Sequence, residues 1–122
     1  SHSGALTFGH DGWDQARDEW FRREFMPVLG PNPTGGPNDL LALAERLPSG
    51  ERPSLRFDCG LDDFLLDANR RFHRHLEQID YVHEYEEFPG THEWGYWDVH
   101  VRDALAFHDR NLGWRSSDRR IG

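Results

Sequence analysis

Two short segments in the second half of the chain carry residue types that could form an acid–base pair. Residues 58–63 include neighbouring carboxylates at Asp62 and Asp63, and residues 89–94 include His92. A carboxylate that accepts a hydrogen bond from one imidazole nitrogen leaves the other nitrogen to act as a general base. The two segments therefore predict two members of a nucleophilic triad. The alternative at this point is that a loop aspartate serves only as a turn former, or that Asp62 caps the helix that follows.

Strand and helix patterns alternate around these segments. Residues 54–59 alternate as in a buried strand, and residues 82–88 form a second, more polar strand pattern near a sheet edge. Residues 64–79 and 94–112 have apolar side chains at helical spacing. This order predicts an α/β fold with parallel strands and right-handed crossover helices. Both polar segments follow strands, so they should meet at the carboxyl edge of the sheet, where α/β proteins bind ligands.

The first half of the chain is less regular. Residues 1–8 resemble the end of a strand that runs into a loop, and residues 14–29 predict a helix that stops at Gly30. Asn38 is a candidate cap for a short helix over residues 39–47.

These patterns divide the chain into three parts. Residues 1–50 hold a strand end and a helical excursion, residues 51–112 hold the strand–helix–strand–helix unit, and residues 113–122 form a tail. Two or three strands cannot cover the apolar faces of the helices, since an isolated strand pair is marginally stable. We therefore expect the fold to be incomplete as a stand-alone domain and to need further strands. In the last helix the apolar stripe expected to face the core consists of Trp94, Trp97, Val101, Ala104, Leu105, His108 and Leu112.

The residues that flank the acid and the base are more specific than the pair itself. Gly60 and Asp63 precede Phe-Leu, and His92 lies within Pro-Gly-Thr-His-Glu-Trp. With these two motifs the chain resembles the esterase family of α/β-hydrolases that includes tributyrin-type esterases, with S-formylglutathione hydrolases as more distant relatives. The resemblance covers nearly the whole chain and is strongest over residues 52–112. It implies the C-terminal portion of one α/β-hydrolase domain, with the opening Ser-His-Ser-Gly-Ala-Leu as the strand after the nucleophile helix.

The same resemblance implies a serine esterase that hydrolyses small carboxylic or thio esters without a cofactor. Asp63 is similar to the triad acid of the family and His92 to its base, while Asp62 is the neighbour most easily confused with Asp63. The family nucleophile lies on Gly-x-Ser-x-Gly, which does not occur in this sequence. We therefore expect the nucleophile and the oxyanion hole in a missing N-terminal half, and no activity from the chain alone. The alternatives are a non-catalytic binding or assembly module with the same fold, and an acyltransferase.

Composition restricts the partners and the compartment. The net charge of −8 disfavours a nucleic-acid partner, because phosphates require a basic surface. No apolar run approaches the ~20 residues of a membrane span. The single cysteine, Cys59, cannot form an internal disulfide, which favours a reducing, cytoplasmic location. The exposed sheet edge also predicts association between copies of the chain.

Other candidate sites are disfavoured by their spacing. His73 and His75 are two residues apart on a predicted helix and should point to different faces, unlike the ligands of a metal site. Glu84 and Glu86 share one face of a strand, which indicates a solvated surface more than a glycosidase pair. Cys59 is at a strand end without a neighbouring histidine in sequence, which is typical of a buried thiol.

Overall fold

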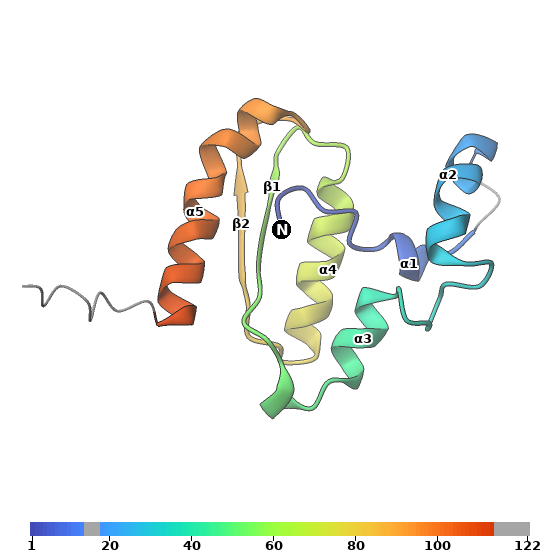
Figure 1. Cartoon of the computed structure of the whole chain (residues 1–122), viewed down its shortest axis with the longest axis horizontal. Helices are drawn as coiled ribbons and strands as arrows, with labels where there is room; N and C mark the ends of the chain where they lie inside the picture. Colours follow the sequence, from blue (N-terminus) through green and yellow to red (C-terminus); the bar gives the residue numbers. More distant parts are fainter. Residues whose placement is uncertain (14–17, 114–122) are drawn as a thin grey trace, which may run out of the picture.

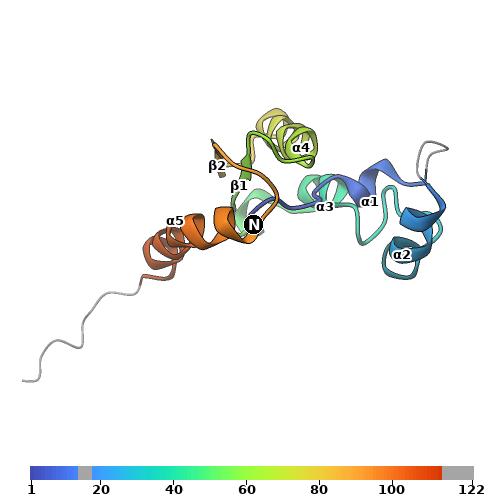
Figure 2. The same cartoon turned by 90° about the horizontal axis from the view of Figure 1, so that it is seen from above.

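A computed structural model of the protein describes residues 1–13 and 18–113. Two strands form a parallel sheet, and helices α4 and α5 lie on opposite sides of it (Figure 1; Figure 2). Among the helices in these ranges, none combines the length and the hydrophobicity required to cross a bilayer. The elements in chain order are α1 (Phe8–Asp11), α2 (Glu19–Leu29), α3 (Leu40–Arg46), a 3-10 turn (Ser49–Glu51), β1 (Arg56–Gly60), α4 (Leu66–Gln78), β2 (Glu84–Phe88) and α5 (Trp94–Leu112).

Strand β1 is the centre of the sheet. It pairs in parallel with β2, from Arg56 opposite Glu84 to Gly60 opposite Phe88. On its other side, the backbone N–H of Ser3 donates to the Asp58 carbonyl over 2.8 Å. All five residues of β1 are buried, as expected for a strand with neighbours on both sides and helices on both faces. The predicted α/β class with a parallel crossover is confirmed.

The apolar core lies between β1, α4 and α3. Helix α4 buries Phe72 and Leu76 against Phe57 of β1, because these residues recur on one face of the helix. Helix α3 adds Leu41 and Ala44 to the same cluster. This core fixes the direction of β1 and α4, and hence the position of the loop between them.

The first half of the chain differs from the prediction in two ways. The helix predicted over residues 14–29 begins only at Glu19 in the described structure, where the Asp18 carboxylate accepts from the Phe21 N–H over 2.7 Å; residues 14–17 lie outside the described residues. Asn38 is not the cap of the next helix. The Asp39 carboxylate caps α3 instead, because it accepts from the backbone N–H groups of residues 41 and 42.

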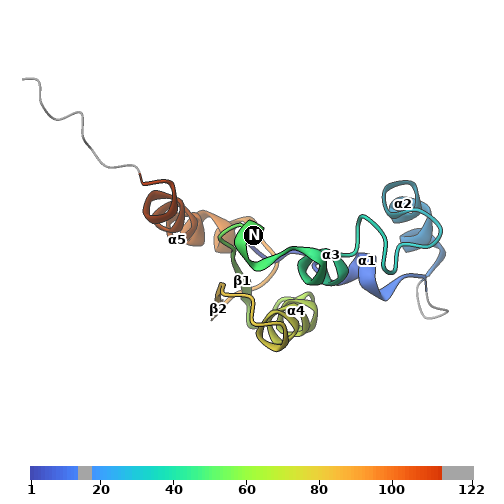
Figure 3. The same cartoon turned by 90° about the horizontal axis from the view of Figure 1, so that it is seen from below.

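Helix α2 packs away from the sheet and buries none of its residues (Figure 1; Figure 3). Its Phe21 and Phe25 rings are stacked with a centroid distance of 4.5 Å, and Phe8 of α1 meets both rings edge-on. Helix α1 itself was not predicted, since four residues are too short for a periodic pattern. These aromatic side chains form a separate small cluster that does not contact the acid and base loops.

Helix α5 has the predicted bounds but turns a different face to the sheet. Tyr96 and Phe107 are buried, whereas Leu105 is 62% exposed and Leu112 is 74% exposed. The predicted core stripe is therefore wrong for this helix, because α5 contacts the sheet through the more polar face that contains Tyr96. The helix ends at Gly113, which has a positive φ of 60°, and residues 114–122 of the predicted tail lie outside the described residues.

Candidate active site

The loops that follow β1 and β2 are joined through their backbones. The N–H of Leu61 donates to the Phe88 carbonyl over 2.9 Å, and the N–H of Asp62 donates to the Gly90 carbonyl over 3.0 Å. A Cβ atom on Gly60 would lie 2.8 Å from the carbonyl carbon of Gly90, closer than a side chain can approach. A glycine is therefore required where the two loops meet.

The two loops bring Asp63 and His92 into hydrogen-bond contact. Their Oδ2 and Nδ1 atoms are 3.0 Å apart, and the Asp63 side chain is 0% exposed while that of His92 is 35% exposed. A carboxylate can only accept, so Nδ1 carries the proton of the neutral imidazole and Nε2 presents a lone pair. The arrangement therefore joins a buried acid to a solvent-facing base, as a proton-transfer pair requires.

Asp63 also fixes its own loop, and Asp62 does not compete for the histidine. The second carboxylate oxygen of Asp63 accepts from the backbone N–H of Leu65 over 2.8 Å, so the side chain is held from two directions. Asp62 is exposed. The alternative role of Asp62 as a helix cap is not found, since Leu65 occupies the N-cap position of α4 and no side chain caps it.

Asp58, in strand β1 before the loop of Asp63, is a buried carboxylate that the sequence analysis did not single out. Asp58 is 0% exposed and contacts Arg56 over 2.6 Å, the Tyr96 hydroxyl over 2.8 Å and the His2 imidazole over 2.7 Å. Burial alone would raise the pKa of the Asp58 carboxyl, but the hydrogen bonds from His2, Arg56 and Tyr96 outweigh it and hold the pKa below its usual value. The alternation of a strand does not indicate a buried carboxylate. Burying an aspartate inside a sheet is unfavourable unless it is paired and hydrogen-bonded, and the strand pattern does not reveal those partners.

The lone cysteine is a structural residue, as the sequence indicated. Cys59 is fully buried, and its burial together with the charge of Asp63 raises the pKa of the thiol to about 11. The reactive thiolate is thus scarce at neutral pH.

Iodoacetamide should therefore leave Cys59 of the folded protein unmodified at pH 8, where only about one thiol in a thousand is ionised. The same residue should react stoichiometrically after denaturation in guanidinium chloride. Intact-mass measurements before and after denaturation check this expectation. Complete alkylation of the folded protein within minutes would show that the thiol is accessible and activated.

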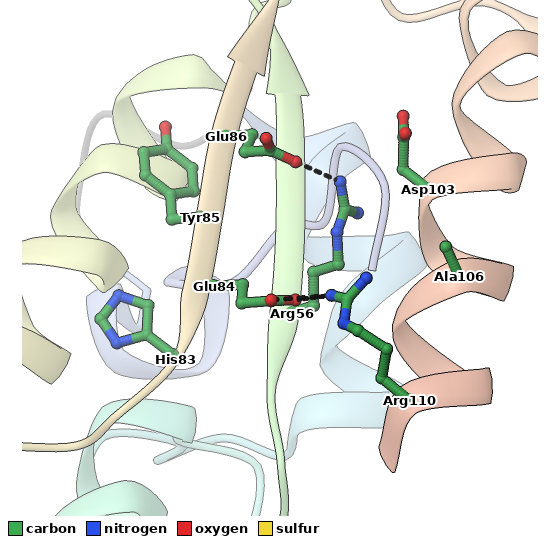
Figure 4. Close-up of a pocket in the computed structure, with 8 residues that line it drawn as sticks. All are labelled: Arg56, His83, Glu84, Tyr85, Glu86, Asp103, Ala106 and Arg110. Atoms are coloured by element: carbon green, nitrogen blue, oxygen red, sulfur yellow. Dashed lines mark hydrogen bonds and ion pairs between the residues drawn. The ribbon is translucent and has the colours of Figure 1, made fainter. Parts of the chain in front are cut away.

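A separate cavity of about 480 Å³ lies between β2 and α5 (Figure 4). Its charged side chains neutralise one another: Arg56 contacts Glu86 over 2.7 Å, and Arg110 contacts Glu84 over 2.8 Å. The predicted solvated face is confirmed for Glu84 and Glu86, whose side chains are 47% and 54% exposed, and both carboxylates are ion-paired with these arginines on the side that faces α5. Since neither Asp63 nor His92 lines this cavity, it is distinct from the acid–base pair.

The histidines of α4 point in different directions, as predicted. Nδ1 of His73 lies 2.7 Å from Nε2 of His83, whereas Nε2 of His75 lies 3.1 Å from the Leu41 carbonyl oxygen. His83 is half-buried and stacks on Phe57 at a centroid distance of 5.7 Å. Within residues 1–13 and 18–113, no three side chains of the metal-binding types converge on one point.

Comparisons with known proteins find that the chain is similar to parts of several esterases. No family model matches the chain. Over 77 residues it is 38% identical to an acetyl esterase of Caldicellulosiruptor saccharolyticus, a match that covers 60% of this chain and 28% of that enzyme.

Solved structures of similar enzymes superpose on most of the chain. A ferulic acid esterase gives a TM-score of 0.64 at 20% identity, over 90% of this chain and 40% of its own. An S-formylglutathione hydrolase of Staphylococcus aureus gives 0.58 at 24% identity, over 87% and 42% respectively. A fluorophosphonate-binding serine hydrolase of Staphylococcus aureus gives 0.57 at 25% identity, with the same coverage.

The chain thus spans less than a third of the acetyl esterase and about two fifths of the solved structures. The resemblance drawn from the two loop motifs is confirmed: this chain has part of the α/β-hydrolase fold and is similar to esterases of the α/β-hydrolase type over part of their length.

Proposed function

We propose that Asp63 and His92 are the acid and the base of a serine esterase, and that its nucleophile lies in polypeptide outside these 122 residues. The observation that carries the proposal is the 3.0 Å contact between the buried Asp63 carboxylate and Nδ1 of the solvent-facing His92. The similarity to an acetyl esterase supports the reaction class. The substrates proposed are small carboxylic or thio esters.

The geometry supports the following role for each residue. Nε2 of His92 takes the proton of the serine hydroxyl as the serine oxygen attacks the acyl carbonyl carbon, and Asp63 stabilises the resulting imidazolium through Nδ1. His92 then protonates the leaving alcohol or thiol as its bond to the acyl carbon breaks. In the second half of the cycle, His92 accepts a proton from water. The hydroxyl oxygen joins the acyl carbon, and the released serine oxygen recovers its proton.

A fluorophosphonate probe tests where the nucleophile lies. In the complete polypeptide, we expect the probe to modify one serine outside the 122 residues, because phosphonylation needs a serine activated by a base. The modified peptide is identified by mass spectrometry. The His92→Ala variant should remain unlabelled over the same interval, and His108→Ala, on the outer part of α5, should label like the unmodified protein.

Two results would contradict the proposal. If the probe modifies a serine within residues 1–122, the nucleophile does not lie outside these residues, as the proposal requires. Labelling that is equally fast in His92→Ala would remove the histidine from the reaction.

A further inference from the structure

The indole of Trp97 lies against the imidazole of His92. The two ring centroids are 5.0 Å apart and the ring planes meet at 89°, an edge-to-face contact. Trp97 is in the first turn of α5, where its backbone N–H donates to the Glu93 carbonyl over 3.3 Å. The ring is therefore carried by a regular helix that begins two residues after His92.

Trp97 also contacts the N-terminal segment, which forms an isolated bridge to β1 on the side away from β2. Its Nε1–H points to the hydroxyl oxygen of Ser3 at 3.5 Å. Ser3 is only 4% exposed, and its backbone N–H donates to the Asp58 carbonyl over 2.8 Å. Ser3 has a positive φ of 52°, a conformation that a non-glycine residue keeps only when its surroundings hold it there. The indole thus contacts Ser3, a buried residue that is itself hydrogen-bonded to β1.

The hydrogen bond to Asp63 does not by itself fix the imidazole. A single Nδ1–H···O contact still allows small coupled rotations about the Cα–Cβ and Cβ–Cγ bonds of His92, and these rotations move Nε2. The other aromatic neighbour, Phe64, has its ring centroid 4.9 Å from that of His92 but is 76% exposed, so it is a weak support. Trp97 is half-buried, so it is the better-packed of these two rings beside His92.

We propose that Trp97 is a positioning residue for the general base: its ring holds the His92 imidazole in the orientation that keeps Nδ1 on Asp63 and aims Nε2 at the reacting serine. This inference rests on the proposed function of Asp63 and His92. It predicts a defect in turnover and not in substrate binding, since misplacing a catalytic group by about 1 Å can cost on the order of a hundredfold in rate.

The experiment compares variants of the complete polypeptide in steady-state hydrolysis of p-nitrophenyl acetate. Trp97→Ala should lower kcat on the order of tenfold to a hundredfold and change KM by less than about twofold. Trp97→Phe, which keeps an aromatic ring, should recover kcat to within about threefold of the unmodified protein. Trp20→Ala is the matched control, because Trp20 is a 58% exposed tryptophan on α2, away from the two loops.

A proton NMR measurement reads the position of the imidazole directly. The Nδ1 proton held by the buried Asp63 carboxylate should give a low-field signal that Asp63→Asn abolishes. The signal should be broadened or lost in Trp97→Ala and in Trp97→Leu, and retained in Trp97→Phe and Trp20→Ala. Trp97→Leu keeps an apolar side chain, so it serves if the alanine variant does not fold.

The outcomes separate this inference from the proposed function. An unchanged kcat in Trp97→Ala and Trp97→Leu, a change confined to KM, or a phenylalanine variant as impaired as the alanine variant would each overturn the positioning role. If His92→Ala and Asp63→Asn retain full activity, the proposed function itself fails, whatever the tryptophan variants do.

Discussion

Replacing His92 by alanine should lower kcat/KM of the complete polypeptide for a small ester by about 10³- to 10⁶-fold, and Asp63→Asn should lower it by about 10³- to 10⁴-fold. The alanine variant loses the group that accepts the serine proton. The asparagine variant keeps the shape of the side chain but presents an amide, which neither fixes the productive tautomer nor stabilises the imidazolium. Initial rates with p-nitrophenyl acetate measure both effects.

The neighbouring aspartate supplies the matched control. Asp62 is exposed, whereas Asp63 is buried against His92. Asp62→Asn should therefore retain kcat/KM to within about threefold, as surface substitutions usually do. If Asp62→Asn is inactive and Asp63→Asn is not, the acid has been assigned to the wrong residue.

The second large effect is expected at Gly60, where the two loops meet. In Gly60→Ala the new Cβ would overlap the Gly90 carbonyl group, so the backbone of one loop must move. Overpacking of this kind typically costs about 1–3 kcal/mol of stability. The displaced loops carry Asp63 and His92, so kcat should also fall on the order of a hundredfold. Urea unfolding and steady-state kinetics measure the two effects.

Gly50 provides the comparison for this substitution. A Cβ on Gly50 meets no atom within 4 Å, so Gly50→Ala should change neither stability nor kcat appreciably. Gly90→Ala should resemble Gly60→Ala, because Gly90 has a φ of 140° and a Cβ there would lie 2.7 Å from the Tyr96 ring. Wild-type turnover and stability in Gly60→Ala would show that the loops are not held by this close approach.

The second half of the chain could be predicted well because its signals are local. The apolar residues at alternate positions before Gly60 indicate a strand, and the helical spacing around Phe72 and Leu76 indicates a helix that buries one face. The contact between Asp63 and His92 could be predicted because both residues follow strands of one parallel sheet, which places them at the same edge. Their flanking glycines then mark the tight approach of the two loops.

The features that the sequence did not reveal depend on contacts between distant elements. The partners of Asp58 come from three places in the chain, so no local pattern identifies it as a buried carboxylate. The exposed stripe of α5 has the same helical period as a buried one, and periodicity alone cannot say which face meets the sheet. The role inferred for Trp97 likewise depends on Ser3, which is 94 residues away in sequence.

The most direct test of the account is a double-mutant comparison of Asp63→Asn and His92→Ala in the complete polypeptide. Residues that act as one catalytic unit show non-additive losses, because once the base is absent the acid has nothing to orient. We therefore predict that kcat/KM of the double variant equals that of His92→Ala to within about threefold. If the two losses instead multiply, Asp63 and His92 act independently, and the acid–base pair proposed for this chain is contradicted.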